Sequence, residues 1–488
     1  MWSRNIDIKK VKEYLPALLF LLSVSLTGCV PVERFWWSPD GEKAVVTFEG
    51  RVHLVCESRR SGEVIAIDDS AAGSAAGSAV WDGVDWFADS SGFVAHRAFP
   101  VEQWTDFVSL IPAEEAQQIE RISESMPDFL RSTVVLGGDA EKLSVLLDRA
   151  IGAPSDSVRN ALLLAQERHP DAVIESLSGA PRARKNLGAY VEEIQGYMVH
   201  EIVSVALDSD AGMSGFSVLH RSVETLASPQ IAPEFPLVAF ARISSGSKAL
   251  VSVEVVSLDG GPTTVCARRV HPAFSWSIDG RSLTTMVPTA GEGILTQIKS
   301  IRLLDEEGTW LPDDQRVTSN LVASAMPFKP RVETLPDGDL LLASRSGDFP
   351  VVNEGASFEA HLYRFSVEDC TLERIATAPH ALPMDLGYFV ASPDGKRVAV
   401  VESETDAVAV VELSTGETEI ISPSHRGWKC RTLPHWRSAD EVSFAALSES
   451  TNRIEWRMWK KGGETRNLSE GWPAGSTDGW LKLSEEKE

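Results

Sequence analysis

The sequence is poor in basic residues for its length. Its 488 residues include 46 Lys and Arg against 70 Asp and Glu, which gives a formal net charge of −24. Nucleic acids and anionic lipid surfaces are bound through a basic footprint, so this balance argues against both as direct ligands. A solvated acidic surface that keeps the protein soluble is the simpler interpretation. We therefore expect no nucleic acid among its partners.

Cysteine and histidine are also scarce, with five and ten residues in the chain. No two cysteines have the Cys-x-x-Cys spacing of zinc sites and thioredoxin-like motifs, and no His-Glu-x-x-His sequence occurs. We therefore expect no metal site and no cofactor. Beyond the N-terminal region, burial in strands is the first interpretation of the cysteines, and one or two disulfides are the alternative, for Cys56, Cys266, Cys370 and Cys430.

Motifs for nucleophilic catalysis and for calcium binding are incomplete. A serine hydrolase of the α/β type requires Gly-x-Ser-x-Gly between a strand and a helix, and the run from Gly212 to Gly215 is one residue short of it. The sequence that starts at Asp208 begins like an EF-hand loop, but its sixth position, which requires glycine, is Met213. We therefore assign no catalytic residue and no metal ligand.

The chain lacks an apolar run long enough to span a membrane, which needs about 20 residues. Its N-terminal apolar run, Ala17 to Leu26, is shorter and follows several basic residues, as in an export signal. The run ends in Leu26-Thr27-Gly28-Cys29, which resembles the lipobox of bacterial lipoproteins. The resemblance implies that residues 1–28 are a signal peptide and that the Cys29 thiol carries a lipid.

The residue after the lipobox bears on where the protein is sorted. In the lipoprotein family an Asp at this position commonly retains the protein at the inner membrane of Gram-negative cells, and this chain has Val30. The resemblance therefore implies an outer-membrane anchor that faces the periplasm, with a Gram-positive cell surface as an alternative. An ordinary signal peptide with a chance cysteine is the other alternative.

A short turn motif recurs along the rest of the chain. Its best copies are Ser-Pro-Asp-Gly at Ser38 and Ser392 and Trp-Ser-Ile-Asp-Gly at Trp276. Asp tolerates a left-handed backbone and Gly adopts it freely, so Asp-Gly between two apolar runs predicts a tight reversal between strands. We assign a structural turn role, in preference to calcium or substrate binding, to Asp40, Gly41, Asp89, Asp279, Gly280, Asp337, Gly338, Asp394, Gly395 and Asp440.

The spacing of these turns predicts the architecture. Most copies lie about 45 to 60 residues apart, close to the length of a propeller blade. Counting a degenerate unit without the motif, we predict a mainly β protein with a propeller of seven four-stranded blades; six or eight are the alternatives. Strands are expected at 397–401, 407–413 and 417–421 in one unit and at 237–243, 249–258 and 263–268 in the degenerate one. Tryptophans before the turns are expected to pack between blades: Trp37, Trp86, Trp276 and Trp436.

The motif is similar to the WD40-like propeller repeats of the TolB family and of the propeller domains of prolyl oligopeptidases. Ser392 to Arg397, with the sequence Ser-Pro-Asp-Gly-Lys-Arg, is the closest match. The resemblance implies the fold and says little about activity, because propellers carry many unrelated functions. No room is left for the peptidase domain of the oligopeptidases, since the repeats run almost to the end of the sequence.

One segment departs from the repeat. Within residues 112–200, apolar residues such as Ile119, Ile122, Met126 and Phe129 follow helical spacing, which predicts an α-helical insertion. We therefore predict the first blades at 29–111, the insertion at 112–200, the remaining blades at 201–480 and a tail at 481–488. The apolar stripes are expected to pack on one another and on the propeller, with an exposed partner groove as the alternative.

These features lead to two hypotheses of function. In the first, the protein is a non-catalytic binding or scaffolding module, held in the cell envelope by the lipid on Cys29 and bound to an envelope protein. In the second, it is a propeller-type hydrolase or lyase that acts on a glycan or peptide at the central channel. The sequence does not determine the oligomeric state.

Overall fold

The computed structural model describes residues 35–48, 51–56, 63–66, 79–100, 198–208, 212–222, 224–243, 251–288, 295–325, 331–345, 360–375, 389–401, 407–421, 428–430, 433–448 and 453–469. The predicted lipobox from Leu26 to Cys29 and the predicted tail lie outside these residues. The predicted helical insertion also lies outside them, except for residues 198–200, which belong to a strand.

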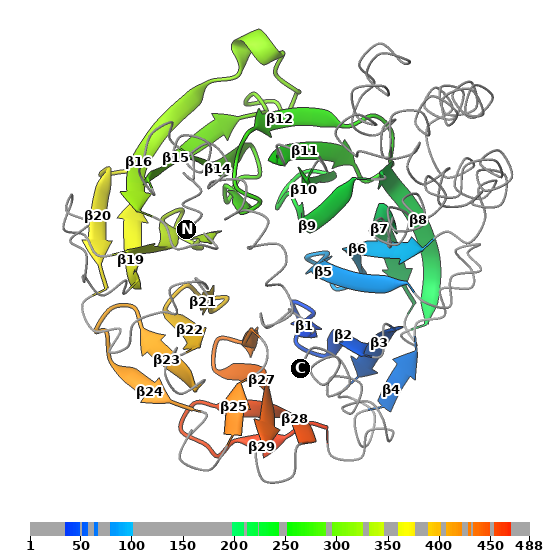
Figure 1. Cartoon of the computed structure of the whole chain (residues 1–488), viewed down its shortest axis with the longest axis vertical. Helices are drawn as coiled ribbons and strands as arrows, with labels where there is room; N and C mark the ends of the chain where they lie inside the picture. The colour runs from blue at the N-terminus through cyan, green and yellow to red at the C-terminus, as the bar shows by residue number, and fades with distance from the viewer. Residues whose placement is uncertain are drawn as a thin grey trace, which may run out of the picture.

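Seven antiparallel sheets follow one another around a common axis in sequence order (Figure 1). This confirms the predicted mainly β, seven-bladed propeller. The first four blades are β1 Phe35–Trp37, β2 Lys43–Phe48, β3 Arg51–Cys56 and β4 Glu63–Ala66; β5 Val80–Trp86, β6 Gly92–Pro100, β7 Met198–Leu207 and β8 Met213–Ser222; β9 Thr225–Ile231, β10 Leu237–Ile243, β11 Val251–Ser257 and β12 Thr264–Arg268; and β13 Phe274–Trp276, β14 Ser282–Pro288, β15 Leu295–Arg302 and β16 Thr318–Ala325.

The last three blades complete the ring. They are β17 Val332–Thr334, β18 Leu340–Arg345, β19 Ala360–Ser366 and β20 Thr371–Arg374; β21 Phe389–Ala391, β22 Arg397–Val401, β23 Val408–Glu412 and β24 Thr418–Ile420; and β25 Trp428–Cys430, β26 His435–Ser438, β27 Glu441–Ser448, β28 Arg453–Lys460 and β29 Arg466–Asn467. In blade 7 both β25 and β26 pair with β27, so its inner edge is built from two short pieces. A single turn of 3₁₀ helix, η3 Asp313–Gln315, precedes β16.

The predicted strands of two blades agree with the structure. β22, β23 and β24 of blade 6 fall within a residue or two of the predicted ranges, and so do β10, β11 and β12 of the degenerate unit, blade 3. Blade 2 contains two strands that were not predicted. β7 and β8 complete it after residues 101–197, and β6 pairs with β7 up to Pro100 opposite Met198.

The repeat tryptophans join neighbouring blades, as predicted. The indole nitrogens of Trp86 and Trp276 each donate a hydrogen bond, 3.1 Å long, to a carbonyl oxygen on the innermost strand of the preceding blade. Trp436 does the same at 2.8 Å. All three side chains are buried, because they fill the space between two sheets. The apolar core is therefore divided into clusters that lie between blades.

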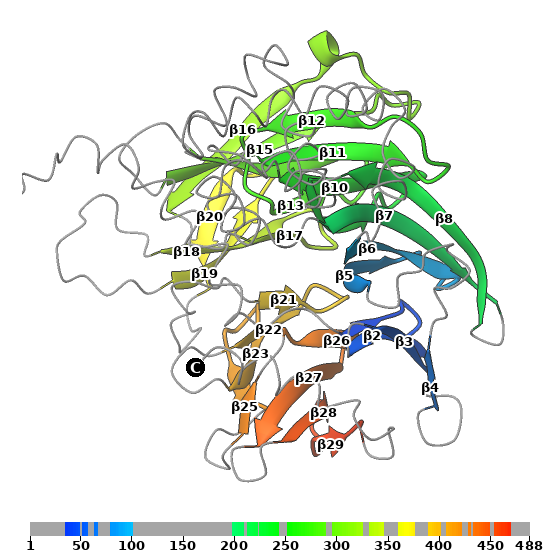
Figure 2. The same ribbon diagram turned by 45° about the vertical axis from the view of Figure 1, so that its right-hand side comes forward.

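Among the described residues, the ring closes between blades 7 and 1 by packing of side chains, because no described strand of one sheet pairs with a strand of the other. The aromatic rings of Phe35 and Trp456 lie 4.8 Å apart between centroids, and both side chains are almost fully buried. The indole nitrogen of Trp37 donates to the Ser443 hydroxyl at 2.9 Å. Figure 2 shows β26 beside β2 at this junction.

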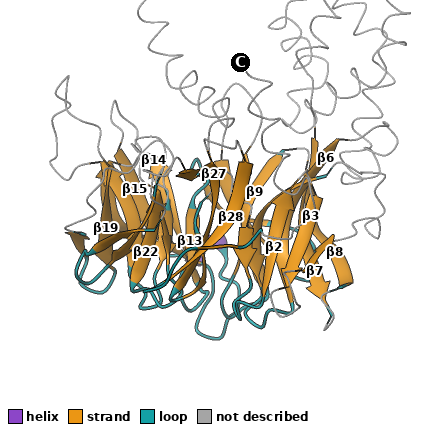
Figure 3. Ribbon diagram, turned by 90° about the horizontal axis from the view of Figure 1, so that it is seen from below, coloured by secondary structure: helices purple, strands orange, loops and turns teal. Residues whose placement is uncertain are grey.

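The two ends of the ring differ. One end, the turn face, carries the tight turns between the first two strands of each blade; Figure 3 shows teal loops of this kind along the lower edge. Neighbouring turns touch: Asp40 N donates to Ser90 Oγ at 3.2 Å, and Arg437 Nε donates to the Gly41 carbonyl at 2.8 Å. The opposite end, the connection face, is where β1 begins at Phe35 and where β6 ends at Pro100.

Candidate functional site

The predicted turn residues lie on the turn face and bond within their own turns. In the first copy, Ser38 Oγ donates to Asp40 Oδ1 at 2.5 Å, and the Glu42 amide donates to the same oxygen at 2.9 Å. Although burial raises the pKa of Asp40, these hydrogen bonds outweigh it and hold the pKa below its ordinary value. Gly41 has φ +69°, which explains the glycine at this position.

Two further copies repeat this geometry. Ser277 Oγ donates to Asp279 Oδ1 at 2.5 Å, and Ser392 Oγ donates to Asp394 Oδ1 at 2.6 Å. In both, burial raises the pKa of the aspartate, and the serine hydrogen bond with its neighbours lowers it below the ordinary value. The glycines that follow, Gly280 and Gly395, have φ of +64° and +66°.

The remaining copies use other partners. Asp89 Oδ1 accepts hydrogen bonds from the amide and hydroxyl of Ser91, at 3.0 and 2.6 Å, and Ser90 takes the left-handed φ of +57° where other turns have glycine. Asp337, followed by Gly338 at φ +92°, accepts from the Asp339 amide at 3.1 Å and pairs with Arg364.

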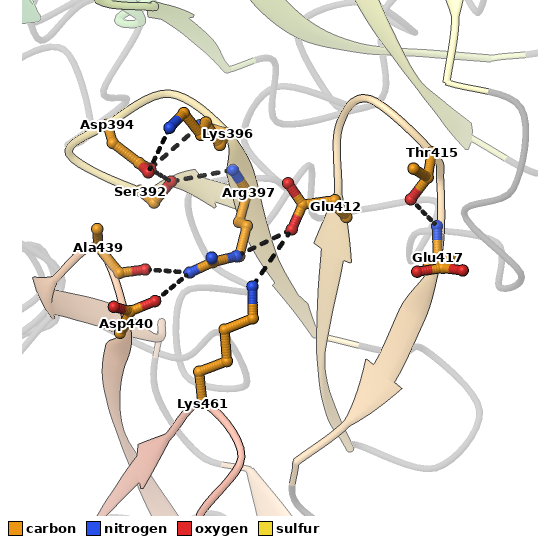
Figure 4. Close-up of polar contacts among 10 residues, drawn as sticks. All are labelled: Ser392, Asp394, Lys396, Arg397, Glu412, Thr415, Glu417, Ala439, Asp440 and Lys461. Carbon is orange, nitrogen blue, oxygen red and sulfur yellow. Dashed lines mark hydrogen bonds and ion pairs between the residues drawn. The ribbon is translucent and has the colours of Figure 1, made fainter.

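Figure 4 shows how the turn of blade 6 is joined to blade 7. Arg397 Nη1 donates to the Ala439 carbonyl at 2.6 Å and to Asp440 Oδ1 at 2.8 Å, while its Nε donates to Glu412 at 3.0 Å. Lys461 lies 3.9 Å from the same Glu412 carboxylate. The predicted turn aspartates therefore hold turns and neighbouring blades together, and they do not converge on one site.

Polar groups that are buried or half-buried converge elsewhere, between blades 2 and 3. We call this group the polar seam. It lies toward the connection face, next to an apolar half of the same interface that contains Val94, Ile202 and Phe240. Buried ionisable groups gathered from several strands are a feature of functional sites. The polar seam consists of Asp82, His96, His200, His220, Glu224, Arg242 and Glu254.

A chain of three side chains crosses blade 2 from its innermost strand. A hydrogen bond joins the carboxylate of Asp82 on β5 to His96 Nδ1, and His96 Nε2 lies 2.9 Å from His200 Nδ1 on β7. The two imidazole planes differ by 9° and their centroids are 5.1 Å apart. The distance between the centroids is close to the N···N distance plus the radii of both rings. The two rings therefore lie edge to edge and nearly in one plane, as a hydrogen bond between their nitrogen atoms requires. Burial, and then the neighbouring His96, lower the pKa of His200 to about 4.

The blade 3 side of the polar seam is an ion-pair cluster. The Arg242 guanidinium pairs with Glu224 and lies 3.6 Å from Glu254, and both carboxylates are buried. His220 of β8 packs on Phe240, and burial lowers its pKa to about 4 against the opposing effect of Glu254. Both His200 and His220 are therefore neutral at pH 7 and can accept as well as donate hydrogen bonds.

The backbone around the polar seam is distorted in a way that brings blades 2 and 3 together. The innermost strands β5 and β9 have seven residues each, whereas β13, β17 and β21 have three. The register of both strands shifts along their length, at Gly83 (φ +56°) and near Ser228 (φ +52°). A Cβ on Gly83 would lie 3.0 Å from Pro229 Cδ, so glycine allows this close approach.

The opposite face of blade 2 holds a second buried ion-pair group. Arg97 Nε donates to Glu201 at 2.6 Å, and Arg221 Nε donates to the other oxygen of Glu201 at 2.7 Å. Arg97 and Glu201 are almost completely buried, and the Arg97 guanidinium lies over the ring of Phe216, 4.6 Å from its centroid. Blade 2 is thus polar on both of its buried faces near the connection face.

The histidines and carboxylates of the polar seam can bind protons and can form hydrogen bonds to polar groups of a ligand.

Within the described ranges no cluster of three or more His, Cys, Asp or Glu side chains has a geometry suited to a metal ion. The described residues also contain no helix with the length and hydropathy of a membrane span. Cys56, Cys266 and Cys370 are thiols rather than disulfides, and burial raises the pKa of Cys266 to about 12.

Sequence reasoning did not find the polar seam. Its residues are spread from Asp82 to Glu254 and belong to no motif, so only the pairing of strands brings them together. One signal was available: His96, His200 and His220 each stand beside a charged residue within a strand sequence. Residues 101–197 separate β6 from β7 in the sequence, so the pairing of these strands could not be predicted. The sequence therefore did not show that the three histidines lie close together.

Known proteins resemble this chain distantly. No family model matches the chain, and no curated protein matches it. Among solved structures, a puromycin hydrolase S511A mutant complexed with PGG is 16% identical, with a TM-score of 0.42; the match covers 56% of this chain and 43% of that one. The chain therefore matches less than half the length of that hydrolase.

Two other structures match over more of their length. TolB from Acinetobacter baumannii is 15% identical with a TM-score of 0.37, covering 80% of this chain and 81% of TolB. An oligogalacturonate lyase from Vibrio parahaemolyticus is 12% identical with a TM-score of 0.39, covering 77% of this chain and 75% of the lyase.

Proposed function

We propose that this chain is a lipid-anchored binding module of the cell envelope, in which blade 2 presents the partner-binding element at the connection face. The anchor is the lipid that the lipobox resemblance implies on Cys29. The partner is an envelope protein.

One observation carries the proposal: residues 101–197 are inserted at the end of a fully formed hairpin. β6 and β7 pair without interruption up to Pro100 opposite Met198, so a two-residue turn would be enough to complete the blade. The corresponding connections in other blades are far shorter, for example 244–250 in blade 3 and 346–359 in blade 5. Connections much longer than a hairpin requires commonly carry function.

The test is to remove this segment without touching the blade. Joining Pro100 to Met198 through Asn-Gly should leave a cooperative thermal transition and the β-sheet circular dichroism unchanged, because the paired strands remain. The crosslinked species that the wild-type chain forms in intact cells should disappear. The matched control joins Arg345 to Ala360 of blade 5 in the same way, and it should keep that species. Retention of the crosslinked species without residues 101–197 would contradict the proposal.

The anchor has its own test. Mass spectrometry of the mature N-terminal peptide should show a lipid on Cys29, and Cys29→Ser should move the protein to the soluble fraction. An unmodified thiol at Cys29 would overturn the anchor and leave the role of blade 2 to be decided by the first experiment.

A hydrolase or lyase is the second candidate, and the Asp82–His96–His200 chain favours it. A carboxylate that orients an imidazole is the usual arrangement of a general base. If the protein is an enzyme of this kind, His200→Asn should abolish turnover of glycans or peptides while the fold persists, whereas Asp279→Asn on the turn face should not. A substrate panel that shows no turnover by the wild-type chain would count against this candidate.

A further inference from the structure

The position of the first strand limits how the propeller can stand on a membrane. β1 is the innermost strand of blade 1, and its Phe35 pairs with Val46 at the end remote from the tight turn at Ser38–Lys43. β1 therefore lies close to the axis of the ring (Figure 1), and its first residue lies at the connection face. Any tether attached upstream of Phe35 pulls on the centre of that face.

The tether is short. Cys29 precedes Phe35 by six residues, and a fully extended chain spans at most about 3.6 Å per residue, or about 20 Å in all. The outermost strand of a blade lies three strand spacings from the innermost, about 14 Å away, before its own thickness is counted. A tether that ran outward over the rim would have too little length left to pass down the side of the blade.

We propose that the connection face is turned toward the bilayer, within about 20 Å of it, and that the lipid surface is its neighbour. This inference rests on the proposed lipid at Cys29. It follows that residues 101–197 leave and re-enter blade 2 on the membrane side, and that the turn face points into the aqueous compartment. The bilayer then occupies the space next to the connection face.

Charge does not supply an alternative means of attachment. The formal net charge of −24 opposes binding to anionic headgroups. The orientation is therefore a consequence of tether length and of the site where the tether joins the ring. It should depend little on the fraction of anionic lipid and strongly on the number of residues before Phe35.

Energy transfer to a labelled bilayer tests the orientation. The lipidated full chain is reconstituted on phosphatidylcholine vesicles that carry a rhodamine lipid, with a donor dye attached through a non-natural amino acid at one position. Val80 and Thr225 are exposed at the connection face, and Glu42 and Glu464 are exposed at the turn face. Because the faces are separated by the length of a strand, about 20 Å, transfer should be markedly higher from Val80 and Thr225.

A lengthened tether is the matched control. A flexible Gly/Ser segment of about 20 residues, inserted between Val32 and Glu33, adds a root-mean-square reach of about 25 Å. It should reduce the difference between the two faces. Equal transfer from both faces with the native tether, or higher transfer from the turn face, would overturn the inference.

Mass spectrometry of the same sample separates the two proposals. With lipid present on Cys29, the transfer experiment decides the orientation alone. Without lipid on Cys29, the anchor of the proposed function fails, and the orientation that rests on it fails as well.

Discussion

A repeated hydrogen bond from an indole nitrogen joins consecutive blades. Trp86, Trp276 and Trp436 each reach a carbonyl group of the preceding blade, while Trp37 bonds to the Ser443 hydroxyl, which itself donates to the His435 carbonyl at 3.2 Å. The side chain at this position thus fills the space between two sheets and also satisfies a buried carbonyl group. Loss of the ring or loss of the hydrogen bond should each weaken the contact between the two blades.

Replacing one of these indoles isolates the hydrogen bond. Trp276→Phe retains an aromatic ring but leaves the Gln230 carbonyl without its donor, so the free energy of unfolding should fall by about 1–3 kcal/mol. Denaturant titration measures the change. Trp310→Phe, at a half-buried position in the connection between β15 and β16, is the control and should cost less. An equal loss in both variants would show that ring size alone matters.

Asp85 is a carboxyl group with unusual titration. Burial raises its pKa to about 6, although hydrogen bonds from the Ile231 and Trp86 amides oppose the increase. Its ordinary pKa is 3.8, so the folded state binds the proton more tightly than the unfolded state does. Its contribution to stability is complete below pH 3.8 and is lost as the pH rises through about 6.

Asp85→Asn should remove this dependence. Relative to the wild type, the variant should gain up to about 3 kcal/mol in unfolding free energy between pH 4 and pH 7, because the wild type loses that amount as Asp85 ionises. Melting temperatures of both proteins across this range measure the difference. Asp89→Asn is the control. Hydrogen bonds from Ser91 hold the pKa of Asp89 low, so this variant should not gain stability relative to the wild type as the pH rises. A difference that does not change with pH would contradict the prediction.

At the scale of the elements, the interface between blades 2 and 3 contains many polar groups. Most blade interfaces are apolar clusters, whereas this one joins an apolar half to the polar seam, and the interface between blades 1 and 2 contains the Arg97–Glu201 pair. Burial lowers the pKa of His200 and His220 to about 4, so the folded state favours their neutral forms. Their contribution is complete above pH 6.5 and is lost as the pH falls through about 4.

Replacing one histidine should reduce this sensitivity to acid. His220→Phe keeps the ring contact with Phe240 and removes the proton-binding nitrogen atoms. Relative to the wild type it should gain about 1–3 kcal/mol between pH 7 and pH 4.5. Urea denaturation at both pH values measures the change. If the two proteins lose the same stability on acidification, His220 is not a source of acid sensitivity.

The elements also show how far the sequence could predict the fold. Turn residues and apolar runs were sufficient for the three outer strands of blades 3 and 6, because each of these strands follows the previous one through a short connection. β7 and β8 were not predicted, since residues 101–197 separate them from the turn at Asp89 that marks their blade. The polar seam depends on the same missing register, so it could not be predicted either.

At the scale of the whole molecule, the ring is closed by side chains alone. In the 35–469 range that the structure describes in part, no strand of blade 1 pairs with a strand of blade 7. Closure depends on Phe35, Trp37, Ser443 and Trp456 and on the bond from Arg437 to Gly41. This junction brings together the first and the last of the described blades.

Removing a closing side chain should therefore affect the whole ring. Phe35→Ala leaves a cavity against Trp456 and should cost about 3–5 kcal/mol of unfolding free energy. Calorimetry measures the loss. Phe389→Ala, at a fully buried aromatic position between blades 5 and 6, is the internal comparison. If only the closing variant shows faster hydrogen exchange in both β1 and β28, the ring opens there first. Unchanged exchange in both strands would mean that closure does not depend on this contact.

Because the ring closes without a shared strand, the fold does not require the chain to begin with blade 1. β1 and β29 belong to adjacent sheets, and each sheet is built from consecutive strands. A circular permutant that links the end of blade 7 to Phe35 and opens the chain between Ala325 and Val332 would keep every strand pair and every contact between blades. Such a molecule should fold to the same ring, and a lipidated N-terminal segment placed before Val332 would join blade 5 instead of blade 1.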